Sequence, residues 1–196
     1  MQAARGTSLT SEEAAGPPDR PAPRRRLLLF AAVALSAYAA DVLSKIWAVH
    51  HLTDREPVPL LGEALQLYLI RNPGAAFSTG LEYTVVFSLL AVVAVVVVLT
   101  VARRVRSAVW AVALGLLLAG VSGNLTDRVF REPGVLRGHV VDFLQLPHWP
   151  IFNLADVCID VAAGLIVLQA LRGISVDGSR AARKSRSAVA ETEGEE

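Results

Sequence analysis

The chain has 196 residues, a formal net charge of +1 and one cysteine, so we expect a single domain without an internal disulfide framework. Hydrophobic residues make up 53% of it, and Val, Ala and Leu come in long blocks, a composition typical of membrane proteins and too apolar for an ordinary soluble domain of this size. No basic patch interleaved with aromatic residues is present, which argues against a nucleic-acid partner.

The first predicted element is a membrane span preceded by a tail. Residues 1–23 are rich in Ala, Gly, Pro, Ser and charged residues, and they are predicted to be disordered. Arginines at 24–26 precede an apolar run from Leu27 to about Val49. The segment also fits a cleavable secretory signal, because a basic start and an apolar stretch are followed by an Ala-x-Ala pattern of small residues at Ala37-Tyr38-Ala39. We favour an uncleaved span, because the run approaches the roughly 20 residues that a bilayer needs and further apolar blocks follow.

The connection from residue 50 to residue 82 is mixed. Pro57, Pro59 and Gly62 interrupt any helix, while leucine alternates with other residues over 65–69 and predicts a half-buried strand. The sequence Arg-Asn-Pro-Gly-Ala-Ala-Phe-Ser at 71–78 is predicted to be a turn-rich loop.

Further apolar segments are predicted to cross the membrane at 84–102, 108–121 and about 152–171. The apolar run at 108–121 leads into Ser-Gly-Asn-Leu-Thr-Asp-Arg at 122–128, so we expect this span to include polar groups that face other helices. A second connection covers 129–150.

The topology follows from the arginines and lysines, which cluster before the first span, between the second and third, and after the fourth. The positive-inside rule places such clusters in the cytoplasm, and four spans with both termini inside satisfy them all. The predicted fold class is therefore membrane α-helical, with four transmembrane helices and a small β-rich extracytoplasmic element built from the two outer connections. The membrane domain is expected at 24–172, between disordered cytoplasmic tails at 1–23 and 173–196.

This topology brings the notable polar residues to the outer side of the membrane. Polar groups within spans are costly and are usually there for a reason. Solvated charges without a common role need not converge in this way, so we infer a functional site there. The converging residues are Asp41, Lys45, Asn72, Asn124, Asp127, Arg128, Asp142, Asn153 and Asp156.

Several of these residues also have structural interpretations. Asp41 and Lys45 share a helix face at i,i+4 and fit a simple ion pair. A Ser44–Lys45 peptidase dyad is disfavoured, because neighbours on a helix point roughly 100° apart. Together with Asn124, the neighbours Asp127 and Arg128 fit a cap that holds the end of the third span by hydrogen bonds and an ion pair.

The start of the fourth span allows similar alternatives. Asn153 and Asp156 share a face at i,i+3, with Asp160 a turn further on, and Asn153 also fits a helix N-cap. His139 and His148 lie near Asp142, but their spacing matches no closed zinc pattern. Cys158 is expected to be a small core residue.

Two other classes of function remain open on these residues. A non-enzymatic lipid-binding or assembly factor would use the polar cluster only to pack helices. A small transporter would use Asp41 and Lys45 as a relay, but polar groups confined to one side argue against a path through the membrane.

Five motifs, in order and covering about 27–171, resemble those of the lipoprotein signal peptidases (signal peptidase II), a family of bacterial membrane aspartic peptidases. The connection from Asp142 to Asp156 is shorter than in many relatives. The motifs are Asp41-Val42-Leu43-Ser44-Lys45, the segment at 71–78, Gly123-Asn124-Leu125-Thr126-Asp127-Arg128, Val140-Val141-Asp142-Phe143 and Phe152-Asn153-Leu154-Ala155-Asp156.

The resemblance implies that Asp142 and Asp156 are the catalytic pair. Asp127 is disfavoured as a member of the pair on physical grounds, because Arg128 beside it favours a permanently charged carboxylate. It further implies a prolipoprotein substrate that carries diacylglycerol on a cysteine and is cut just before it. We expect no cofactor and no metal, and a monomer in the bacterial cell membrane with its active site on the extracytoplasmic side. Residues implied in substrate binding or site support are Asp41, Lys45, Asn72, Gly74, Asn124, Asp127, Arg128 and Asn153.

Overall fold

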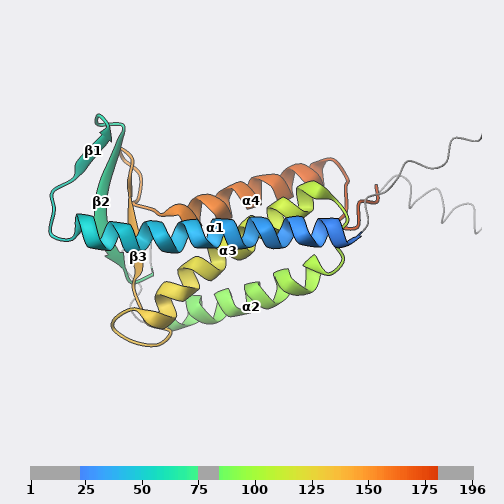
Figure 1. Cartoon of the computed structure of the whole chain (residues 1–196), viewed down its shortest axis with the longest axis horizontal. Helices are drawn as coiled ribbons and strands as arrows, with labels where there is room; N and C mark the ends of the chain where they lie inside the picture. Colours follow the sequence, from blue (N-terminus) through green and yellow to red (C-terminus); the bar gives the residue numbers. More distant parts are fainter. Residues whose placement is uncertain (1–22, 75–83, 181–196) are drawn as a thin grey trace, which may run out of the picture.

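The computed structural model describes residues 23–74 and 84–180, which form a bundle of long helices with a small sheet at one end (Figure 1). Within these residues, four helices are long and apolar enough to cross a membrane. The predicted fold class is therefore confirmed. The helices are α1 (Pro23–Leu52), α2 (Thr84–Ala102), α3 (Ala108–Phe130) and α4 (Leu154–Leu171).

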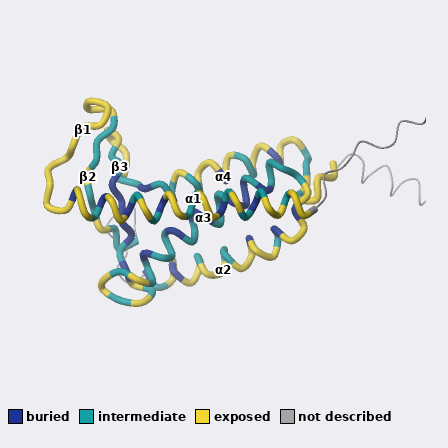
Figure 2. The backbone as a smooth tube through the Cα atoms, viewed as in Figure 1, coloured by how far each residue is buried: buried dark blue, intermediate teal, exposed yellow. Residues whose placement is uncertain are grey.

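The outer surface of the bundle is apolar, as lipid requires. Most of the length of α2 is exposed although it is composed almost entirely of Val, Leu and Ala (Figure 2). A soluble bundle would bury such a helix, whereas hydrocarbon surrounds it without cost. The protein is therefore a multi-pass membrane protein.

Helix α3 is central and packs on α1, α2 and α4. Glycines let it approach two of these helices closely. A Cβ added to Gly115 would lie 2.9 Å from the carbonyl oxygen of Phe30 in α1, and one added to Gly120 would collide with the carbonyl oxygen of Ala155 in α4. Small residues serve this purpose in membrane bundles, where close backbone packing replaces the hydrophobic effect.

The sheet is antiparallel with the strand order β1-β2-β3. The strand predicted over 65–69 is confirmed, but it continues through Arg71 and Asn72, which we predicted as loop. They remain in the strand because they pair with Val141 and Val140. The strands are β1 (Val58–Leu61), β2 (Leu65–Asn72) and β3 (Val140–Gln145).

A one-residue irregularity in the sheet decides which side chains share a face. Leu67 lies opposite Leu144, but Ile70 lies opposite Asp142, so the register shifts between these pairs. Without the shift, Asn72 and Asp142 would project from opposite faces, because side chains alternate along a strand. With it, they are diagonal neighbours on one face, within reach of each other.

Residues 173–180, which we assigned to the C-terminal tail, fold back against the start of α3. The indole Nε1 of Trp110 donates to the carbonyl of Ile174 at 2.9 Å, and the amide of Arg106 donates to the carbonyl of Val176 at 3.0 Å. The rest of both predicted tails and the end of the 71–78 segment lie outside the described residues.

Candidate active site

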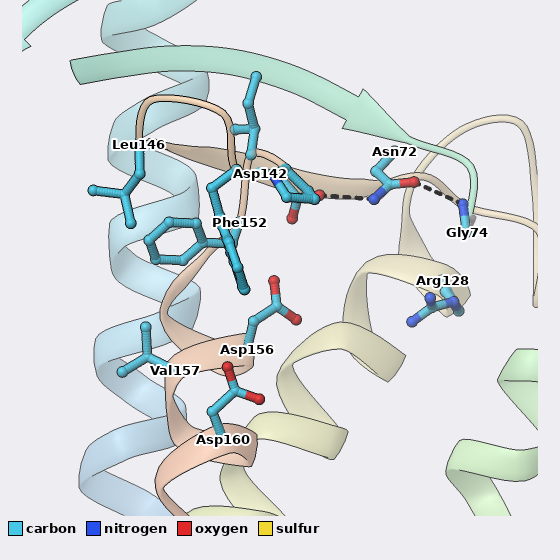
Figure 3. Close-up of a pocket in the computed structure, with 12 residues that line it drawn as sticks. Asn72, Gly74, Arg128, Asp142, Leu146, Phe152, Asp156, Val157 and Asp160 are labelled. Carbon is cyan, nitrogen blue, oxygen red and sulfur yellow. Dashed lines mark hydrogen bonds between the residues drawn. The ribbon is translucent and has the colours of Figure 1, made fainter. Parts of the chain in front are cut away.

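Asp142 in β3 and Asp156 in the first turn of α4 line one cavity of about 440 Å³ at the sheet end of the bundle (Figure 3). Its wall combines polar groups near the two aspartates with an apolar side. The other lining residues are Asn72, Gly74, Arg128, Leu146, Trp149, Pro150, Ile151, Phe152, Val157 and Asp160.

The connection between the two aspartates is short because it closes a hairpin. The amide of Phe152 donates to the carbonyl of Leu144 at 3.0 Å, and the carbonyl of Phe152 accepts from the amide of Leu144 at 2.8 Å. This pairing brings the chain back beside β3 just before α4 begins. Asp142 and Asp156 are thereby held near each other by backbone hydrogen bonds.

Asp142 is almost fully buried, with 2% of its surface exposed. Its Oδ2 accepts from Asn72 Nδ2 at 2.9 Å, and its Oδ1 accepts from Asn153 Nδ2. Asn72 is fixed in turn, because its Oδ1 accepts from the amide of Gly74 at 2.9 Å. Burial raises the pKa of Asp142 to about 6; the bonds from the two asparagines lower it, and the charge of Asp156 adds to the increase.

Asp156 is oriented by a capping box at the start of α4. The side chain of Asn153 accepts from the Asp156 amide, and Asp156 Oδ2 accepts from the Asn153 amide, both at 3.1 Å. The second carboxylate oxygen, Oδ1, accepts from Asn124 Nδ2 at 2.9 Å. Asn153, for which both an N-cap and a role in substrate binding or site support were considered, caps the helix and also binds Asp142.

Two asparagines connect the carboxyl groups. Asn153 Nδ2 donates both to Asp142 and, at 3.2 Å, to Asn124 Oδ1. The Nδ2 of Asn124 in turn donates to Asp156. An amide can donate and accept at once without adding charge. The two aspartates are therefore held in one hydrogen-bonded unit whose linking groups remain neutral.

Behind this unit lies a buried charge cluster of Asp41, Lys45 and Asp127, which we call the Lys45 cluster. The Lys45 ammonium lies 2.9 Å from Asp41 Oδ2 and 3.1 Å from Asp127 Oδ2, and it also donates to Asn124 Oδ1 at 2.9 Å. Charges this deeply buried are tolerated only when they are paired and hydrogen-bonded. The ion pair considered for Asp41 and Lys45 is present.

The Lys45 cluster also holds the main chain beside each site aspartate. Asp41 Oδ1 accepts from the amide of Ala155 at 2.9 Å, and Asp127 Oδ2 accepts from the amide of Val141 at 3.2 Å. Ala155 directly precedes Asp156, and Val141 directly precedes Asp142. One ammonium thus connects two carboxylates, each of which fixes the backbone next to a site residue.

The ion pair considered for Asp127 and Arg128 does not form among the described residues. Asp127 pairs with Lys45 and with Arg131, one helical turn away, whereas Arg128 lines the cavity. Consecutive helix residues point in different directions, so an i,i+4 partner is favoured over a neighbour. Arg131 was not predicted as a partner of Asp127, although the i,i+4 spacing could have indicated it.

Two further alternatives do not form in the described residues. Ser44 Oγ donates to the carbonyl of Asp41 at 2.8 Å, and it makes no hydrogen bond to Lys45. Across residues 23–74 and 84–180, His139 and His148 join no group of three or more metal-ligating side chains.

Comparisons with known proteins agree on one family. The model of the family described as signal peptidase (SPase) II matches residues 33–172. A lipoprotein signal peptidase of Leifsonia xyli is 50% identical over 155 residues, covering 79% of this chain and 72% of that protein. One of Streptomyces coelicolor is 46% identical over 162 residues, covering 83% and 79%. A solved bacterial membrane enzyme has the same fold, with a TM-score of 0.65 and 24% identity over 74% of this chain and 89% of that one.

Proposed function

The chain belongs to the signal peptidase II family, aspartic peptidases that process prolipoprotein signal peptides, and we propose that Asp142 and Asp156 are its catalytic dyad. The observation that carries the proposal is that these carboxyl groups, from β3 and α4, line one cavity and are linked through Asn153 and Asn124. Asp41 and Asp127 do not line it, and both are engaged with Lys45.

The dyad acts on water without a covalent intermediate. Two close carboxyl groups cannot both ionise cheaply, so the pair retains one proton and behaves as a single titrating unit. The ionised member takes a proton from water, which attacks the scissile carbonyl. The protonated member donates to the carbonyl oxygen and later to the leaving amine. Asn153 and Asn124 keep both carboxyl groups oriented throughout.

The substrate is a prolipoprotein with diacylglycerol on its cysteine, and the cut falls just before that cysteine. The signal helix and acyl chains hold this substrate in lipid, so its scissile bond lies near the interface. The cavity lies at the end of the helix bundle, where apolar side chains such as Trp149 and Leu146 form part of its wall. That is a suitable place for a bond presented at a membrane edge.

The proposed location is the bacterial cell membrane, with both termini in the cytoplasm and the sheet outside. The ends of α1 and α4 nearest the termini and the α2–α3 turn lie together, opposite the sheet (Figure 1). Arginines at 24–26, 103, 104, 106 and 172 belong to this end, as the positive-inside rule expects of a cytoplasmic face. A monomer is proposed because one chain supplies every residue of the dyad and its supports.

Activity is expected to depend on pH through the shared proton. Because the pKa of Asp142 is raised to about 6, the dyad loses its proton as the pH rises through that value. We expect kcat/KM to fall on the alkaline side with an apparent pKa near 6, measured on a peptide without titratable side chains near the cut. A rate that stays constant from about pH 5 to pH 8 would contradict this assignment.

The free energy of unfolding should also decrease as the pH rises through this range. A carboxyl whose folded-state pKa exceeds its unfolded value stabilises the fold fully below the unfolded pKa. That contribution of Asp142 is lost as the pH rises through about 6.

The direct test compares two substrates with the purified full chain in lipid. We expect a diacylglyceryl prolipoprotein to be cut before its cysteine and the unmodified precursor to be cut at least about 100-fold more slowly, because the acyl chains supply binding and positioning. The cut site is read by mass spectrometry. A protein whose polar cluster only packs helices would cut neither substrate, and equal rates on both would exclude recognition of the lipid.

A further inference from the structure

Asp160 is a carboxylate in the cavity wall that the dyad does not use. It lies in α4 one turn beyond Asp156, and Figure 3 shows the two carboxyl groups on the same side of the helix. Its side chain is exposed, and within residues 23–74 and 84–180 it makes no hydrogen bond or ion pair. Asp142 and Asp156, by contrast, each accept at least two hydrogen bonds.

The position of this charge is unusual for a membrane span. Ionisable residues inside spans are costly, and they almost always face a partner, a bundle interior or a water-filled cavity. The exposed residues Val161 and Val167, which do not line the cavity, show what lipid-facing positions of α4 otherwise carry. Because Asp160 lines the cavity, its charge is directed at whatever fills that space.

Geometry indicates which part of the substrate it meets. Helix α4 runs from the sheet end into the bundle, so Asp160 lies about 6 Å deeper than Asp156. In the proposed function, the signal peptide is the part of the substrate that continues into the membrane, whereas the lipidated cysteine follows the cut. An extended chain advances about 3.3 Å per residue, so this depth corresponds to about two residues before the cut.

We propose that Asp160 is a specificity residue that contacts the side chain of the signal peptide about two residues before the cut. An ionised carboxylate only accepts hydrogen bonds, so it favours a hydroxyl, amide or cationic side chain. It opposes a second carboxylate, because like charges repel strongly where water is scarce. This inference rests on the proposed function, since it assumes cleavage at the Asp142–Asp156 pair.

The test uses diacylglyceryl peptides that differ only in the second residue before the cysteine, which is Lys, Ser, Ala or Asp. With the full chain in lipid, we expect kcat/KM to be highest for the Lys and Ser peptides and lowest for the Asp peptide. The Asp160→Asn variant should reduce the ratio of Lys to Asp rates at least about tenfold. The matched control Asp54→Asn removes a carboxylate from the turn after α1, outside the cavity, and should leave the ratio unchanged.

If Asp160→Asn folds poorly, a second variant with the opposite charge at this position still tests the proposal. Asp160→Lys should invert the preference toward the Asp peptide, which loss of folded enzyme cannot do. An equal ratio in the wild type and Asp160→Asn would overturn the proposal, as would a charge preference that appears only at another substrate position. Failure of the wild type to cut any of the four peptides would instead count against the proposed function itself.

Discussion

Replacing either Asp142 or Asp156 with asparagine is expected to abolish processing, with kcat reduced by roughly 10³-fold or more. Asparagine keeps the size of the side chain but can neither take a proton from water nor hold the shared proton. In Asp156→Asn, the amide oxygen can still accept from the Asn153 backbone, so the capping box and the helix start are preserved. The loss of activity should therefore come from the missing proton transfer and not from unfolding.

The measurement pairs cleavage of a diacylglyceryl peptide with thermal unfolding of the same preparation. Glu63→Gln is the matched control, because it converts an exposed carboxylate in the β1–β2 turn and should leave both readouts unchanged. Near-normal cleavage by either dyad variant would refute the assignment. Loss of folded protein in step with activity would favour the view that the polar cluster only packs helices.

The second large effect is expected at Lys45, and it concerns stability. Lys45→Met leaves Asp41 without its cation, and Asp127 keeps only Arg131. Removing one partner of a buried ion pair typically costs about 3–5 kcal/mol, because the remaining charge stays buried. We expect a free energy of unfolding lower by about that amount, measured by denaturation in lipid or detergent.

A double variant separates lost charge balance from lost packing. Adding Asp41→Asn to Lys45→Met removes the unpaired charge, while the new amide oxygen can still accept from Ala155. We expect it to recover at least about 1 kcal/mol of the loss. Arg104→Met, which removes an exposed cation at the opposite end of the bundle, should change stability by less than about 0.5 kcal/mol. An unchanged stability in Lys45→Met would show that the Lys45 cluster is dispensable.

The spans were predictable because a span needs an apolar block of sufficient length, and arginine lies beside the proposed cytoplasmic end of each block. The extent of β2 was not, since Arg71 and Asn72 resemble turn residues and are strand only through pairing with β3. The register shift near Ile70 depends on the partner strand as well. Edge strand β1 was not predicted because it contains Pro59, and proline argues against a central strand. Proline is nevertheless tolerated at a sheet edge, where β1 lies.

The candidate site also has a part that the sequence could predict and a part that it could not. Asp142 and Asp156 could be selected from their motifs, and Asn153 from its capping position. The supports could be named but not connected, because Asp41 and Asp127 act on the backbone amides of Ala155 and Val141. A main-chain donor has no side-chain signature, so no pattern of residue types reveals such a contact.

The composition of the Lys45 cluster also bears on how the protein enters the bilayer. Asp41 and Lys45 are both in α1, and Asp127 and Arg131 are one turn apart at the end of α3. Each segment can therefore be inserted during synthesis with its acid and base already neutralising each other, before any other helix has arrived. Only when the helices associate does Lys45 acquire Asp127 as a second partner. The four charges of Asp41, Lys45, Asp127 and Arg131 would thus serve insertion first and the support of the candidate site afterwards.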